Sequence, residues 1–177
     1  HDRDLAAAGI TTVCDAIAIG DVTPTSMRAT EFQSMIDAIE TQQTLGKFSV
    51  DHRLHLRCEL AFEEVASQVN QYATHPLLSL ISLMDHTPGQ RQFKKMDKFR
   101  EYYMGKHGIT ETEMDEFIRD RLAAQKAYAR TSRQALVKMA ADHSLAMASH
   151  DDATIEHVQQ AISEGATISE FPTTLEA

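Results

Sequence analysis

The sequence lacks the features that mark secreted and membrane proteins. It contains two cysteines, Cys14 and Cys58, too few for a disulfide framework or a cysteine metal cluster. No apolar run reaches the roughly 18 residues that a membrane-spanning helix needs, and the opening HDRDLAAAGI lacks the basic and then apolar pattern of a signal peptide. We therefore expect a cytoplasmic protein with two reduced thiols.

Positive charge is also scarce. The chain has 17 Lys and Arg against 26 Asp and Glu, a formal net charge of -9. Nucleic acids and membrane surfaces both require a basic face, so neither is expected as a partner, and a small molecule is. With 177 residues, 42% of them hydrophobic, the chain can bury a core, and we expect residues 1–177 to form a single domain.

Strand-like and helix-like segments alternate along the chain. Runs rich in β-branched and apolar residues predict strands at 10–21, 52–60, 77–86, 144–152 and 166–171. Helical periodicity predicts helices at 30–45, 61–74, from 110, from 132 and at 153–164, with a long irregular loop at 87–109. Parallel neighbours need a crossover of about a dozen residues, so this rhythm predicts an α/β fold with a parallel sheet.

Helix ends and one absent motif refine this prediction. Thr30 with Gln33, and Thr110 with Glu113, predict capping boxes, and Gly46 predicts the end of the first of these helices. A doubly wound nucleotide-binding sheet carries a G-x-G-x-x-G loop after its first strand, which AIAIGDVTPTS is not. We therefore favour a TIM-type barrel.

Polar residues stand where the predicted strands end. They are Glu59, Asp85-His86, His150-Asp151-Asp152 and Glu170. The carboxyl ends of barrel strands form the face that holds the active site, and imidazoles with carboxylates are the ligands that a divalent metal requires.

Strand alternation sharpens this expectation. In HRLHLRCE, residues His55, Arg57 and Glu59 share one face, while Leu54, Leu56 and Cys58 share the other. The apolar face should pack against helices, so the ionisable face should line the barrel interior, where it must be paired or bound to an ion.

Each of these polar residues has a structural alternative. A histidine at a strand end is often held by hydrogen bonds and binds nothing. Asp151 or Asp152 could cap the following helix, and Glu170 could belong to a loop.

The segment after His86 is locally basic. Between residues 91 and 106 six cations face Asp97 and Glu101, a balance of six minus two, or +4. The cations are Arg91, Lys94, Lys95, Lys98, Arg100 and Lys106. Such a segment suits a polyanionic small molecule. The alternative is a solvated loop that covers Phe93, Phe99, Tyr102 and Tyr103.

The stretches AAAGITTVCDAIAIGD, HRLHLRCEL, SLMDHTPGQRQF, ASHDDAT and EFPTTLEA together resemble the amidohydrolase superfamily, in its branch of diphosphatases from the carbon–phosphorus lyase pathway of phosphonate breakdown. The resemblance implies a (β/α)₈ barrel with a divalent metal at its mouth, zinc, manganese or magnesium. It also implies that water releases diphosphate from a small phosphorylated sugar, a ribose methylphosphonate triphosphate. On this basis Glu59, His86 and His150 are the expected metal ligands, and Arg57, Arg91 and Lys94 the expected phosphate contacts.

The chain also departs from the superfamily pattern. The H-x-D pair of the first strand and the catalytic aspartate of the last strand are missing, and about five of eight strand–helix units can be counted. We therefore expect an internal fragment, with the catalytic aspartate outside it. A partial barrel exposes two sheet edges, which favours pairing with missing segments or with a second copy in a homo-oligomer.

Two other functions stay open. A relative with the same metals could cleave an amide or cyclic amide, but such a substrate gives the basic segment no partner. Alternatively, the chain could be a catalytically silent fold or assembly module, which metal content after purification would distinguish.

Overall fold

A computed structural model describes residues 1–20, 23 and 26–177. It has five strands, which are β1 (Thr12–Ile19), β2 (Asp51–Glu59), β3 (Leu78–Met84), β4 (Ala146–His150) and β5 (Ile168–Glu170). The α-helices are α1 (Asp2–Ala7), α2 (Arg28–Thr44), α3 (Val65–Asn70), α4 (Met96–His107), α5 (Glu111–Ala124), α6 (Arg130–Asp142) and α7 (Ile155–Ser163). A 3₁₀ turn, η1 (Arg91–Phe93), precedes α4, and a π-helical turn, η2 (Gln125–Ala129), joins α5 to α6.

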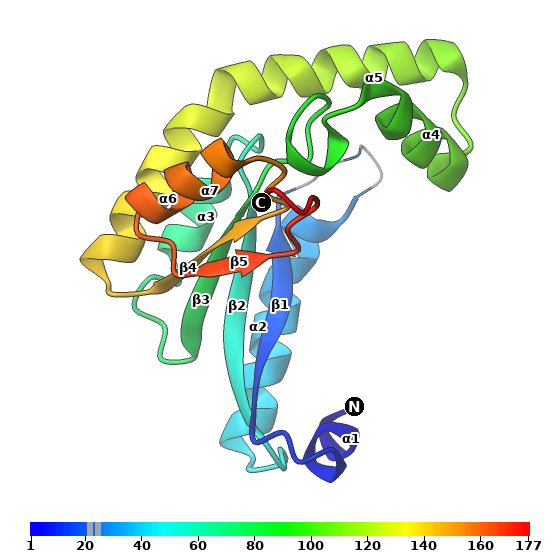
Figure 1. Cartoon of the computed structure of the whole chain (residues 1–177). Helices are drawn as coiled ribbons and strands as arrows, with labels where there is room; N and C mark the ends of the chain where they lie inside the picture. Colours follow the sequence, from blue (N-terminus) through cyan, green and yellow to red (C-terminus); the bar gives the residue numbers. More distant parts are fainter. Residues whose placement is uncertain (21–22, 24–25) are drawn as a thin grey trace.

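The strands form one parallel sheet in chain order, β1-β2-β3-β4-β5. This confirms the α/β prediction and is the order that successive units of a barrel give. Within the described residues the sheet stays open, with β1 and β5 at its edges. Helices α2, α3, α6 and α7 lie along the sheet, while α4 and α5 lie over the carboxyl ends of the strands and α1 lies at the opposite end (Figure 1). No helix among the described residues is long and apolar enough to cross a membrane.

The predicted division of faces in β2 is confirmed. Leu54, Leu56 and Cys58 are fully buried in the core, together with Ile36 of α2 and Leu136 of α6. Burying a leucine side chain of this size is worth about 1.5–3 kcal/mol. The core therefore fixes β2 with its polar face turned away from the helices.

The long connection after β3 is more ordered than we expected. We predicted an irregular loop at 87–109, but it contains η1 and α4. A second apolar cluster orders it, in which Phe93, Phe99 and Tyr103 pack on Met114 and Ile118 of α5. The contacts are between segments distant in sequence, so helical periodicity alone gave little sign of them. We name α4 and α5 the cap helices.

Several helix boundaries also needed correction. Helix α2 begins at Arg28, so Thr30 lies inside it and donates its hydroxyl to the Met27 carbonyl (3.0 Å) and does not cap the helix. Helix α3 is shorter than the predicted 61–74, and Ser132 lies inside α6 and does not start a helix. The capping box at Thr110 and the end of α2 at Gly46, with φ +61°, are confirmed.

The amino-terminal helix is held to the sheet by one carboxylate. Asp2 accepts hydrogen bonds from the backbone N–H groups of Ser49 (2.9 Å) and Val50 (3.2 Å), and it lies 3.2 Å from His52 Nε2. Burial opposes ionisation of Asp2, but these hydrogen bonds prevail and lower its pKa from 3.8 to about 2. Because the pKa in the folded protein is depressed, the stabilisation is present above pH 3.8 and is lost as the pH falls towards 2.

We predict that Asp2→Asn lowers the free energy of unfolding at neutral pH and weakens its pH dependence between pH 3.8 and about 2. Urea unfolding followed by circular dichroism at several pH values measures both effects. Asp4→Asn is the control, because the Asp4 side chain is 89% exposed. Identical curves for the two variants would contradict the role of Asp2.

Candidate functional site

The site begins with a carboxylate that is completely buried. Glu59, the last residue of β2, is 0% exposed. Its Oε2 atom accepts a hydrogen bond from His86 Nδ1 (2.6 Å), and Oε1 accepts from the His86 backbone N–H (3.2 Å) and from Arg121 Nη2 (3.4 Å). Glu59 therefore fixes both the backbone and the ring of His86.

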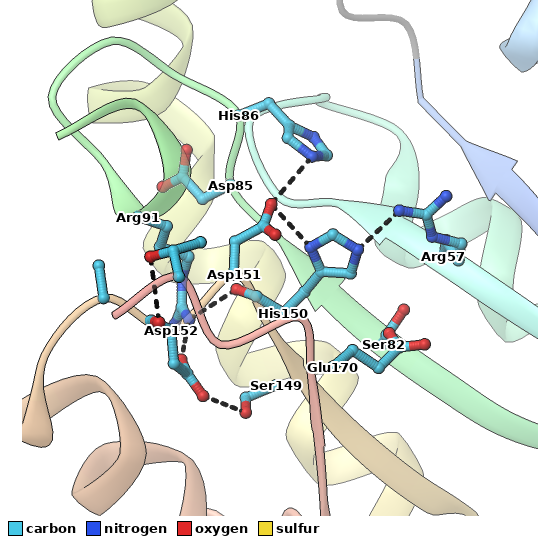
Figure 2. A network of polar contacts seen from close by, with 12 residues as sticks. Arg57, Ser82, Asp85, His86, Arg91, Ser149, His150, Asp151, Asp152 and Glu170 are labelled. Atoms are coloured by element: carbon cyan, nitrogen blue, oxygen red, sulfur yellow. Dashed lines mark hydrogen bonds and ion pairs between the residues drawn. The ribbon is translucent and has the colours of Figure 1, made fainter. Parts of the chain in front are cut away.

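His150 and Asp151 complete the group at the end of β4 (Figure 2). Asp151 Oδ2 lies 2.9 Å from His150 Nδ1 and 3.6 Å from His86 Nε2. Simple alternation would place Asp151 on the opposite face from His150. Asp151 has φ +54°, however, and its N–H donates to the Glu170 carbonyl (2.9 Å), so the chain turns sharply. This turn brings the carboxylate beside the imidazole.

His86, His150 and Asp151 form a group that can hold a metal ion, and we name it the metal-ligand group. Ligand atoms of His86, His150 and Asp151 lie within 4.8 Å of one another. His150 Nδ1 is buried and faces Asp151 Oδ2 at 2.9 Å, although the contact lacks the geometry of a hydrogen bond. Two imidazoles and a carboxylate are a donor set suited to zinc or manganese. The residues present therefore fit a divalent cation.

Charges within the group shift the pKa values of its members. Burial would lower the pKa of His86, but hydrogen bonds and charge from Asp151 and Glu59 raise it to about 9. Burial alone would raise the pKa of Asp151, and the two histidines hold it well below its usual value. The pKa of Glu59 is lowered in the same way, chiefly by His86. The carboxylates are therefore ionised, as metal ligands must be.

Arg57 contacts the far side of His150. Its Nη2 atom donates to His150 Nε2 (2.6 Å), while its Nε atom is buried and has no hydrogen-bond partner in the described part of the chain. Because Nε2 accepts this hydrogen bond, the proton of the neutral imidazole is on Nδ1. Arg57 therefore fixes the tautomer of His150.

Arg91 lies behind the group in a separate buried pair. Its side chain is 6% exposed, its Nη1 atom donates to the His150 carbonyl (3.0 Å), and it forms an ion pair with Asp152. Asp152, which is 0% exposed, also accepts from Ser149, and its carbonyl accepts from Thr173 N–H (2.8 Å). We name Arg91 and Asp152 the strand-end pair. It ties the ends of β3, β4 and β5 together.

The remaining predicted residues lie nearby but in different settings. Asp152 does not cap α7, because Thr154 caps that helix. Lys94 is exposed, with no hydrogen bond or ion pair to the described residues. Glu170 lies on β5, with Oε1 3.7 Å from His55 Nε2, which also contacts Ser82 Oγ (2.9 Å). Glu170 is also the partner of His150 in the register of β4 and β5.

The basic segment is only partly available to an anion. Lys98 pairs with Glu101 (2.6 Å), and Arg100 pairs with Glu111 (2.9 Å) and with Asp115. Those two cations belong to the surface of the cap helices. Within the part of the chain that the structure describes, Lys94 and Lys95 have no such partner.

Three backbone positions at the same strand ends are unusual. Arg91, Asp151 and Phe171 have φ of 41°, 54° and 54°, which side chains other than glycine rarely adopt. Such residues persist where surrounding contacts hold them, and they cluster at functional sites. The Phe171 ring lies 5.4 Å from the His150 ring, so all three border the metal-ligand group.

Comparison with known proteins supports the resemblance seen in the motifs. The chain is 42% identical over all of its 177 residues to alpha-D-ribose 1-methylphosphonate 5-triphosphate diphosphatase of Escherichia coli (strain K12). The predicted resemblance is confirmed. The chain spans 47% of that protein, about half of its length. No protein-family profile and no solved structure matches the chain.

Sequence reasoning missed two features of the site. Asp151 was counted among the polar residues at the strand ends, with a helix cap as the alternative, but it was not among the expected metal ligands, because a left-handed backbone turn has no reliable signal in a single sequence. Arg91 was expected to contact phosphate, and its buried contact with Asp152 joins residues 61 positions apart. The phosphate contact of Arg91 stays a prediction.

We predict that Asp152→Asn lowers the free energy of unfolding by about 3–5 kcal/mol, because it leaves the buried Arg91 guanidinium without its counter-charge. The matched control is Asp142→Asn, which removes an exposed pair with Lys138 and should cost at most about 1 kcal/mol. Urea unfolding measures both values. Similar costs for the two variants would show that the strand-end pair contributes little.

Proposed function

We propose that this chain forms part of a metal-dependent hydrolase that releases diphosphate from alpha-D-ribose 1-methylphosphonate 5-triphosphate. The observation that supports the substrate is the 42% identity along the whole chain to the diphosphatase of that name. The observation that supports metal dependence is the convergence of His86, His150 and Asp151 at the strand ends.

The metal would be held by His86, His150 and Asp151. A divalent cation supplies two things in such hydrolysis, a lower pKa for attacking water and neutralisation of phosphate charge. Glu59 has both oxygens engaged with His86, so it orients that ring in the arrangement described. Partners of this kind tune metal affinity strongly. Glu59 as a direct ligand stays a prediction.

The position of the ring proton on His150 links Arg57 to metal binding. A neutral imidazole carries one proton, and Arg57 now donates to its unprotonated Nε2. A metal on Nε2 would displace Arg57 directly. A metal on Nδ1 would move the proton to Nε2, where Arg57 can no longer donate. In either case metal binding releases the Arg57 guanidinium.

We infer that the released Arg57 contacts the phosphate chain, with Lys94 as a further contact at the mouth. Guanidinium groups suit phosphate because they donate two parallel hydrogen bonds. Lys94 is exposed and has no ion pair with described residues, so it is available to an anion. Binding of the metal would therefore precede binding of the triphosphate.

We predict that His86→Ala, His150→Ala and Asp151→Asn each weaken metal binding by at least about tenfold. Calorimetric titration of zinc or manganese into chelator-treated protein measures the affinity, and circular dichroism checks the fold. His143→Ala is the control, because His143 is exposed at the end of α6. Unchanged affinity in all three variants would contradict the site, and a wild-type chain that binds no metal would favour a silent fold.

Arg57→Ala should have opposite effects on the two ligands. Metal affinity should rise by about tenfold, because no hydrogen bond to His150 is lost on binding. Affinity for a nucleoside triphosphate in the presence of metal should fall. Lys94→Ala should lower the affinity for the triphosphate and leave metal affinity unchanged. Added salt should lower the triphosphate affinity of the wild type.

The measurement is calorimetry with metal alone and then with metal and triphosphate, at two salt concentrations. A fall in metal affinity in Arg57→Ala would contradict displacement of Arg57. A triphosphate affinity that does not change with salt, with Arg57→Ala or with Lys94→Ala would favour a substrate without phosphates, such as an amide.

A further inference from the structure

A second polar pocket lies outside the metal-ligand group. It has a volume of about 290 Å³, is open to solvent on one side, and is lined by residues of the η1 segment, the π-helical turn η2, α6 and α7. A molecule of liquid water occupies roughly 30 Å³, so the pocket has room for a small anion and bridging waters. It does not include His86, His150 or Asp151 in its lining. We name it the η2 pocket.

The two carboxylates that line the η2 pocket already have partners. Glu164 accepts hydrogen bonds from Arg133 Nε (2.8 Å) and from Gln160 Nε2 (2.9 Å), and its Oε2 lies 2.6 Å from Arg133 Nη2. Asp85 accepts from the backbone N–H of Thr87 (3.1 Å) and from its hydroxyl. Arg91, a second arginine of the lining, pairs with Asp152, so none of these carboxylates neutralises the third, Arg130.

Three other donors in the lining, in contrast, make no such contacts with the described residues. Arg130, Gln125 and Gln134 make no side-chain hydrogen bond or ion pair with the described residues. His157 Nδ1 accepts a hydrogen bond from the Ala153 N–H (3.2 Å), so the ring proton is on Nε2, a further donor. The lining thus offers one guanidinium, two amides and an imidazole N–H to a ligand.

Three arginines and two carboxylates line the η2 pocket. Burial lowers the pKa of His157, and the charges of Arg91, Lys94 and Arg133 lower it further against the opposing charge of Asp152. The ring is therefore neutral and donates without a charge of its own. A π-helical turn forms one wall, and such turns are frequent at functional sites.

We propose that the η2 pocket binds a phosphate-type oxyanion, held by Arg130, by His157 Nε2–H and by the amide groups of Gln125 and Gln134. Two sources share this chemistry, free phosphate and the diphosphate that the proposed reaction would release. The pocket meets the metal-ligand side through Arg91, which lines it and also contacts the His150 carbonyl.

The test uses the whole chain with a chelator present, so that its result is independent of any metal. Calorimetric titration with inorganic phosphate, diphosphate and sulfate should show one saturable site. Arg130→Gln should weaken binding by about tenfold, the worth of one charge-assisted contact. Tighter binding of diphosphate than of phosphate would identify the reaction product as the source, and the reverse order would identify free phosphate.

Two control variants make the outcome decisive. Arg119→Gln removes an exposed charge from α5 outside the η2 pocket and should leave binding unchanged. His150→Ala should also leave it unchanged. Equal losses in Arg119→Gln and Arg130→Gln would mean general charge attraction and would overturn the proposal. Loss of anion binding in His150→Ala alone would place the anion at the metal-ligand group and overturn the proposal. The absence of any anion binding to the wild-type chain would overturn it as well.

Discussion

The arrangement of side chains at the carboxyl ends of the strands depends on neutralising the buried carboxylate of Glu59. An ionised carboxylate out of contact with water is very costly unless it is paired. His86 and Arg121 supply the pairing, at 2.6 Å and 3.4 Å. They come from the segment after β3 and from α5, so one charge on β2 fixes the position of both. Burial together with the charge of Glu59 also raises the pKa of Tyr103 on α4 to about 12.

A continuous helical segment connects the charge of Glu59 to the rest of the domain. Helices α5 and α6 follow one another through η2 without a break. The first carries Arg121 to Glu59 at the mouth, while the second packs Leu136 and Met139 into the main core. The aromatic cluster around Phe99 then holds α4 on α5. Core burial far from the site therefore restrains the cap helices that cover the strand ends.

The sequence predicts those parts of the site that follow from local pattern. Alternation in β2 and polar residues at strand ends indicate that Glu59, His86 and His150 meet at one edge, where the structure places them. The local pattern does not predict the turn at Asp151, because its left-handed φ is held by a hydrogen bond to Glu170 on β5. It also does not predict α4, whose buried residues Phe99 and Tyr103 pack on Met114 and Ile118 of α5.

Acceptors and donors alternate along the whole mouth. The order is Glu59, His86, Asp151, His150 and Arg57, each in contact with the next. In this chain the charges of Glu59 and Asp151 are balanced without an ion by His86, whose pKa they raise to about 9, and by Arg57 at the open end. A divalent cation held by His86, His150 and Asp151 would supply positive charge more strongly and leave Arg57 without a partner inside the group. The same sequence of charges therefore gives a site that is stable without an ion, and it supports the proposal that Arg57 becomes available to an anion when a metal binds.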